Sequence, residues 1–282
     1  MRIIATLFAL LSIIHTYGLD ITVGTGQSLL DALSAADASE TTLIVHGTVD
    51  ATDMAAIRDR LPALTYLDMS DATVVPAIIP DYTFAATKIE QFLPPRNLTG
   101  IAEGAFAATP LRSFAVAGGL TDIGPHAFAH CQTLTTASLG DNISNIDKYA
   151  FSDCTAMTSV VVGRNLHSIG ECAFQLSGLE SLDLSHCDRL VAIGDRAFTQ
   201  SPKLKHVTLP DHTFSIGRGA FSFNPYLISV DGLEGAETLP ELFAAGCSRY
   251  IPDLTHAGSL YDPGLRTSRR QDPDDYFPPC HS

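Results

Sequence analysis

Six cysteines are the residues of this sequence whose type most readily supports chemistry: Cys131, Cys154, Cys172, Cys187, Cys247 and Cys280. They form no CxxC motif, and no group of Cys and His has the spacing of a zinc site. An even cysteine count in an exported chain is typical of disulfide-bonded proteins. Cys131 and Cys154 each follow a phenylalanine by three residues, so they are a candidate disulfide between equivalent positions.

The histidines offer one pair with a chemical spacing, His126 and His130, at i and i+4. On a continuous helix this spacing suits a metal ion, but here the pair flanks Phe128 in a segment too short to supply a third ligand. The chain contains no GxSxG, HExxH, P-loop or GxGxxG motif. The sequence therefore predicts no enzyme activity, no metal site and no cofactor.

A sequence motif, here called the repeat phrase, recurs every 22 to 24 residues through the middle of the chain. The fold built by these repeats must position the side chains named above. Phenylalanine marks each copy, an isoleucine stands five residues before each of the first seven, and alanine precedes the phenylalanine in six of them. The marking residues are Phe84, Phe106, Phe128, Phe151, Phe174, Phe198, Phe221 and Phe243. Such self-similarity predicts a repeat architecture.

A second pattern, LxxLxL, lies between these phrases, as in Leu134/Ala137/Leu139 and Leu179/Leu182/Leu184. Its last part alternates apolar and polar residues as a half-buried strand does. Each repeat is therefore one short strand, a turn and a compact returning segment. A single unit cannot bury its apolar face, so we expect the units to stack about 4.8 Å apart through strand pairing.

The combined phrase, seen in Ile123-Gly-Pro-His-Ala-Phe-Ala-His-Cys131 and its sister copies, resembles the leucine-rich repeats of BspA-like surface proteins. The resemblance covers about residues 76–246, in about seven repeats. It implies an α/β solenoid: a right-handed superhelix with a parallel β-sheet on its concave face and short helices or turns on the convex face. It also implies a secreted or cell-surface protein with a role in adhesion or recognition.

The repeat register assigns two sets of residues. The phenylalanines are expected to form a structural spine inside the stack: Phe84, Phe106, Phe128, Phe151, Phe174, Phe198 and Phe221. Strand residues that alternate with the buried ones face outward and are candidates for binding a partner: Ser113, Thr136, Ser138, Ser159, Ser181, Asp183, His206, Thr208 and Asp231. This surface is rich in hydroxyl groups and nearly uncharged.

The resemblance also bears on the cysteines. It favours buried thiols at Cys131 and Cys154, acting as small apolar residues, over the disulfide. Cys187 takes the Asn/Cys position of a leucine-rich repeat. Cys172, two residues before Phe174, is expected to be partly exposed, and Cys280 is the best candidate for a reactive thiol.

The flanks differ from the repeats. Residues 1–18 have one arginine, an apolar run and small residues at the end, which predicts a signal peptide. Residues 19–75 are expected to cap the stack, with a strand at 41–49 and a helix begun by Asp50 or Thr52. Residues 247–282 lose the register and are rich in Pro, Asp, Arg and Ser, so they are expected to be disordered, either natively or through a frameshift.

The charge balance excludes some partners. Thirty-one acidic and 17 basic residues give a net charge of −14, which argues against nucleic acid and against an anionic membrane surface. The leading hypothesis is a monomeric interaction or adhesion module that binds a protein or glycan at the cell surface or in the extracellular matrix, without integral membrane contact. The alternatives are a structural spacer without a ligand and, third, a hydrolytic enzyme.

Overall fold

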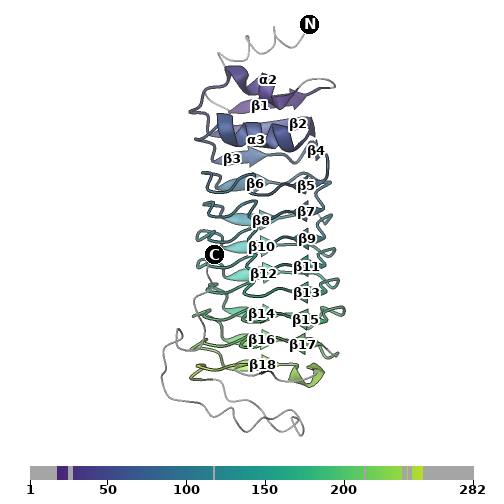
Figure 1. The fold of residues 1–282 in the computed structure, drawn as a ribbon, viewed down its shortest axis with the longest axis vertical. Helices are drawn as coiled ribbons and strands as arrows, with labels where there is room; N and C mark the ends of the chain where they lie inside the picture. The colour runs from purple at the N-terminus through teal and green to yellow at the C-terminus, as the bar shows by residue number, and fades with distance from the viewer. Residues whose placement is uncertain are drawn as a thin grey trace.

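The chain folds into a β-solenoid of about nine turns, shown from the side in Figure 1. The computed structural model describes residues 18–24, 28–116, 118–212, 214–236, 240 and 243–249. All strand pairs in the described part are parallel, as a solenoid requires. Residues 1–17 of the predicted signal peptide and residues 250–282 of the predicted tail, including Cys280, lie outside the described residues.

The N-terminal region is a distinct unit that contains the α-helices of the described chain. Its elements are β1 (Leu19–Val23), α2 (Leu29–Ala32), η2 (Leu33–Ala35), β2 (Thr42–Val49), α3 (Ala51–Arg60), β3 (Tyr66–Asp68) and β4 (Ala72–Val74). The predicted strand and helix are confirmed, and Asp50 caps α3 by accepting hydrogen bonds from the backbone of Thr52 and Asp53.

Asp53 joins the two helices of this unit. Its carboxylate is buried and accepts one hydrogen bond from Leu29 N, at the start of α2 (2.8 Å), and one from Asp50 N (3.2 Å). A buried carboxylate is stabilised when backbone N–H groups at helix N-termini satisfy it. Asp53 therefore fixes α2 against α3 through polar contacts, which no sequence pattern had indicated.

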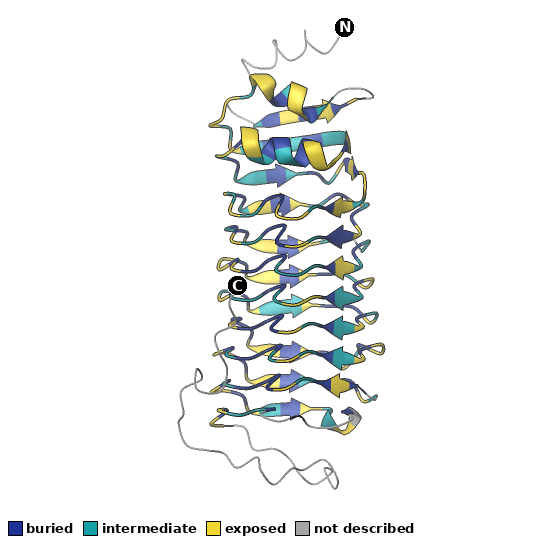
Figure 2. Ribbon diagram, viewed as in Figure 1, coloured by how far each residue is buried: buried dark blue, intermediate teal, exposed yellow. Residues whose placement is uncertain are grey.

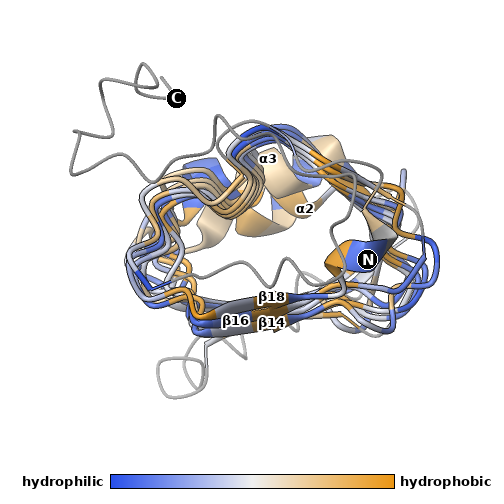
Figure 3. Cartoon of the chain, turned by 90° about the horizontal axis from the view of Figure 1, so that it is seen from below, coloured by the Kyte–Doolittle hydropathy of each residue, from blue (hydrophilic) through white to orange (hydrophobic). Residues whose placement is uncertain are grey.

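The LxxLxL segments form the first column of strands, as predicted. These strands are β3, β6 (Gln91–Leu93), β8 (Ser113–Ala115), β10 (Thr136–Ser138), β12 (Ser159–Val161), β14 (Ser181–Asp183), β16 (His206–Thr208) and β18 (Ser229–Asp231). They belong to three sheets with the orders β1-β2-β3-β6, β8-β10-β12 and β14-β16-β18. Figure 3, viewed down the long axis, shows β14, β16 and β18 opposite α2 and α3.

A second column of strands, which the sequence analysis did not predict, runs along another side of the solenoid (Figure 1). Each of its strands has two residues and ends at the isoleucine of the repeat phrase. The strands are β5 (Ile78–Ile79), β7 (Gly100–Ile101), β9 (Asp122–Ile123), β11 (Asn145–Ile146), β13 (Ser168–Ile169), β15 (Ala192–Ile193) and β17 (Ser215–Ile216). Within the regular repeats, turns and these short strands return the chain, and the described part has one further 3-10 helix, η3 (Leu233–Gly235).

The phenylalanine spine is present in the interior. Consecutive rings from Phe106 to Phe221 are parallel to within 8° and have centroids 5.1–5.4 Å apart. Phe84 begins the spine with a tilt of 32°, and Phe243 ends it edge-on at 68°. The ring spacing follows from the strand spacing, because each turn contributes one ring at the same position.

The cysteine positions belong to a polar ladder inside the solenoid. In five of the repeats, a short polar side chain near the end of the phrase donates to the phenylalanine carbonyl of the preceding turn. The accepting carbonyls belong to Phe106, Phe128, Phe174, Phe198 and Phe221, and the donors are Cys131, Cys154, Ser201, Asn224 and Cys247. Within the described residues no buried side-chain nitrogen or oxygen lacks a partner.

Two expectations about the cysteines change. Cys131 and Cys154 are thiols and form no disulfide, but they act as hydrogen-bond donors and not simply as small apolar residues. Burial raises the pKa of the Cys131 thiol to about 11 and that of Cys187 to about 12. The expectation that Cys172 is partly exposed is wrong, because its side chain is fully buried.

The turns bring backbone very close to backbone. At Gly170, Gly194 and Gly217 a Cβ atom would lie 2.3–2.6 Å from a backbone nitrogen of the preceding turn, so a side chain is excluded by the stacking itself. Other corner positions hold non-glycine residues at positive φ, including Ala108 at 56° and His126 at 55°. These corners carry conformational strain that the stacked core must offset.

Candidate functional site on the strand face

The outward side of the first strand column is here called the strand face. In β8, β10, β14, β16 and β18 the central residue is buried and its two neighbours are exposed or half-buried (Figure 2). In β12 the central residue, Val160, is half-buried. Of the nine candidate residues, seven are exposed, and Ser159 and Thr208 are half-buried. The outward placement agrees with the predicted alternation; binding by these residues stays a prediction.

Strand register brings these residues into rows. Ser113, Thr136 and Ser159 are direct neighbours across β8, β10 and β12, and Ala115, Ser138 and Val161 form the parallel row beside them. These six outward side chains carry hydroxyl and methyl groups and no charge. Val161 is 57% exposed, more than any other bulky apolar side chain in the described part of the chain. The part of the strand face over β8, β10 and β12 is therefore a flat, neutral patch.

The C-terminal half has a different chemistry. Across β14, β16 and β18 the register aligns Ser181, His206 and Ser229 in one row, and Asp183, Thr208 and Asp231 in the other. With strands about 4.8 Å apart, the two aspartates lie about 10 Å from each other. Hydrogen bonding from the side chain of Ser185, and then from its backbone N–H (2.9 Å), lowers the pKa of the Asp183 carboxyl, which stays ionised near neutral pH.

His206, Ser229 and Asp231 form a hydrogen-bonded chain on this half. Ser229 Oγ lies 3.1 Å from His206 Nδ1 and donates to Asp231 Oδ2 at 3.2 Å. In a serine nucleophile the hydroxyl donates to a histidine that a carboxylate orients. Here the serine stands between the other two residues and donates to the carboxylate, so this order does not activate it. These three side chains form a polar network at the surface that is suited to hydrogen bonding with a partner.

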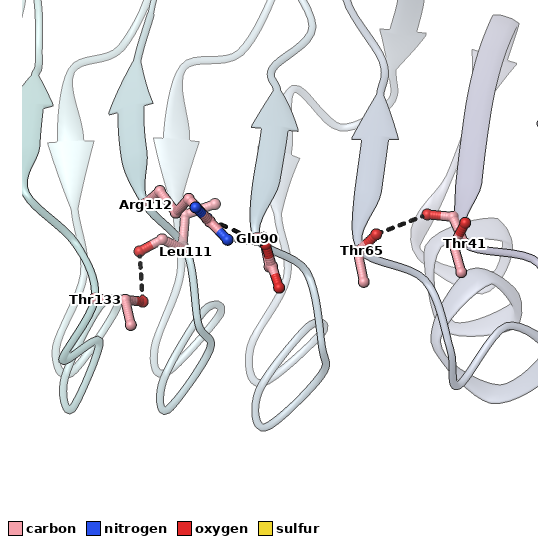
Figure 4. A network of polar contacts seen from close by, with 6 residues as sticks. All are labelled: Thr41, Thr65, Glu90, Leu111, Arg112 and Thr133. Carbon is pink, nitrogen blue, oxygen red and sulfur yellow. Dashed lines mark hydrogen bonds and ion pairs between the residues drawn. The ribbon is translucent and has the colours of Figure 1, made fainter.

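Two ion pairs lie beside the strand face, one in each half. Arg112 Nη2 is 2.6 Å from Glu90 Oε2, in the row that immediately precedes the strands (Figure 4). Lys205 Nζ lies 4.0 Å from Glu180 Oε2 at the corresponding positions farther along. In the same row as Arg112, Thr65 Oγ1 donates to the carbonyl of Thr41. Sequence reasoning missed this row. Apart from Thr41, which follows Glu40, each of these residues directly follows the first apolar residue of an LxxLxL-type pattern.

The histidine pair considered for a metal has structural roles instead. His126 stacks on Tyr149 with ring centroids 4.8 Å apart, and desolvation lowers its pKa. His130 Nδ1 lies 3.0 Å from Asp153 Oδ2. The described part of the chain contains no group of three His, Cys, Asp or Glu residues arranged to hold a metal ion. None of the helices described is long and apolar enough to cross a membrane.

Comparison with known proteins supports the architecture. A family model described as a BspA type leucine rich repeat region matches in six copies, over residues 77–190 and 168–251. No relative matches among the curated proteins.

Two crystal structures of bacterial proteins share the fold. A leucine-rich repeat protein from Bacteroides ovatus is 19% identical with a TM-score of 0.53, over 75% of this chain and 59% of its own length. The leucine-rich repeat protein TpLRR of T. pallidum is 27% identical with a TM-score of 0.51, over 63% of this chain and 83% of its own. The chain thus spans less than two thirds of the Bacteroides ovatus protein.

Proposed function

The chain belongs to the BspA-type leucine-rich repeat family, and from this premise we propose that it is an exported interaction module that binds a protein or glycan through the strand face. Proteins of this repeat class are often surface proteins that mediate interactions. The observation that carries the proposal is the strand face itself: rows of outward side chains that are in register across β8, β10 and β12 and, in a second sheet, across β14, β16 and β18.

The repeated residues and the outward residues have different roles. The phenylalanine spine fills the interior and the polar ladder donates to buried carbonyls, so the repeated residues serve the fold. The outward residues of β14, β16 and β18 instead place ionised, hydrogen-bonding and neutral groups within one area. Repeat proteins commonly use such an extended surface to bind macromolecules. Recognition by the strand face therefore requires no rearrangement of the core.

The test is capture of partners by the exported chain, with extracellular-matrix proteins and a glycan array as the two probe sets. A variant combining Asp183→Ala, His206→Ala and Asp231→Ala should weaken binding at least tenfold, because polar groups central to an interface contribute strongly. The control changes Asp20, His46 and Asp71, which have the same residue types and form an exposed ion-pair group in the N-terminal unit.

Three outcomes separate the hypotheses. Loss of binding in the strand-face variant alone supports the proposal. Equal affinity of both variants for a captured partner moves the site elsewhere on the molecule. If neither probe set yields a partner, the chain is better described as a structural spacer, the alternative that shares this fold.

Export is the second part of the proposal. Residues 1–18 would be removed, so the mature chain would begin at Leu19, the first residue of β1. Mass spectrometry of the protein recovered outside the expressing cells should find Leu19 at its N-terminus. A protein retained inside the cells with Met1 still present would contradict export.

A further inference from the structure

An exposed apolar patch lies at the N-terminal edge of the second strand column, away from the strand face. It consists of Val75, Pro76, Ile78 and Tyr82 and is here called the edge patch. Val75 is 53% exposed, Ile78 36% and Tyr82 50%. Three of the ten exposed bulky apolar side chains of the described chain thus fall within eight residues. Exposed apolar side chains grouped this closely along the chain indicate a candidate interaction site.

Glycines of the next turn shape this patch. Ile78 lies over Gly100, where a Cβ atom would be 2.9 Å from the Ile78 Cγ2 atom. Tyr82 lies over Gly104, where a Cβ atom would be 2.3 Å from Cε1 of the ring. Both side chains therefore rest on backbone instead of on other side chains. The absence of side chains at these two positions gives the edge patch a flat surface that extends over two turns.

The tyrosine ring is also held in place. Its hydroxyl donates to Glu103 Oε1 at 2.6 Å, and Glu103 N in turn donates to Asp81 Oδ1 at 3.0 Å. A ring fixed in this way loses little conformational entropy when a partner covers it. Tyrosine is among the residues that most often dominate binding energy at interfaces. Tyr82 therefore has the position and the preorganisation of a central contact residue.

The surroundings of the patch define the charge of its occupant. Asp81 and Glu103 are exposed carboxylates beside Tyr82, and neither makes an ion pair within the described residues. Arg96 is paired with Asp71 at 3.6 Å. An acidic rim around an apolar centre favours a partner that places positive charge at the rim.

We infer that the edge patch docks a protein segment in which an aliphatic or aromatic side chain is flanked by Lys or Arg. The apolar side chain would cover Ile78 and Tyr82, and the basic group would lie beside Asp81 and Glu103. β5, the terminal strand of the seven-stranded sheet, carries the apolar centre of this site (Figure 1). The site is separate from the strand face and stands whether or not that face binds a partner.

The probe is a random peptide library displayed on phage and selected on the immobilised exported chain. Enriched peptides should combine an apolar residue with adjacent Lys or Arg. Their dissociation constants, measured by fluorescence polarisation, should rise at least tenfold with Tyr82→Ala and with Ile78→Ser. Glu103→Gln should weaken binding less, mainly at low salt. Thermal melting checks that each variant is folded.

Matched controls make the result decisive. Tyr226→Ala removes a tyrosine of similar exposure, 47%, at the opposite end of the solenoid and should leave the affinity unchanged. Enriched peptides without basic residues, or affinities within twofold for Tyr82→Ala and Ile78→Ser, would overturn the inference. Sedimentation in which the chain self-associates, and in which Ile78→Ser abolishes that self-association, would also overturn the inference. Binding of cellohexaose that depends on Tyr82 would assign the patch to a glycan and also overturn it.

Discussion

Replacing Phe151 with alanine tests the spine at its centre. Phe151 is fully buried and lies between two parallel rings, 5.1 Å from Phe128 and 5.2 Å from Phe174. Removing a buried phenylalanine costs about 3–5 kcal/mol through lost burial and the cavity left behind. That total already includes the two ring contacts, each worth about 0.5–1.5 kcal/mol beyond the area term, so their loss places Phe151 in the upper part of the range. We expect a loss of about 4–5 kcal/mol, a large fraction of a typical domain stability.

The assay is urea unfolding at equilibrium, followed by circular dichroism and by tyrosine fluorescence, which is usable because the chain has no tryptophan. Val161→Ala, in the same turn but 57% exposed, is the control and should cost about 0.5 kcal/mol or less. A loss below about 1 kcal/mol for Phe151→Ala, or one equal to the control, would refute the stacked spine as the main source of cohesion between turns.

Three further changes probe the interior and the corners. Cys154→Val should cost about 1 kcal/mol more than Cys154→Ser in urea unfolding, because valine cannot donate to the Phe128 carbonyl; equal costs would contradict the ladder. Burial raises the pKa of Cys131 from 9.0 to about 11, so the native state holds this proton more tightly than the unfolded state. Stability should therefore fall as pH rises from about 9 to 11, and a Cys131→Ser chain with an unchanged pH slope would disprove this contribution. Ala108→Gly relieves a corner at φ 56° and should stabilise the chain by about 0.5 kcal/mol, whereas Ala115→Gly in strand β8 should destabilise it by about 0.5–1 kcal/mol; the same sign for both would contradict the strain.

The repeat register predicted the fold because two sets of residues obey strict spacing. The phenylalanine interval fixed the spine, and LxxLxL fixed which strand residues face outward, so the candidate surface followed from alternation. The second strand column was missed for a physical reason. Its strands, such as Asn145–Ile146, are only two residues long, and alternation cannot be read from two residues.

Other features depend on contacts between turns that no local pattern reveals. Cys131 and Cys154 were assigned to the interior correctly, but their donation to carbonyls of the preceding turn depends on the stacking geometry. Cys172 was misplaced because the equivalent position of other repeats, such as Tyr82, is exposed, and the residue type alone does not show that the Cys172 side chain is buried. The edge patch likewise depends on Gly100 and Gly104 lying beneath apolar side chains from the previous turn.

Carboxyl footprinting of the complex with a captured partner tests the central claim, that the strand face is the recognition surface. Carbodiimide labelling of Asp183 and Asp231 is read by mass spectrometry with and without the partner, and Asp20 and Asp71 serve as internal references. The account predicts that the partner protects Asp183 and Asp231 severalfold and leaves the references unchanged. Unprotected Asp183 and Asp231 in a complex that is otherwise saturated would contradict it.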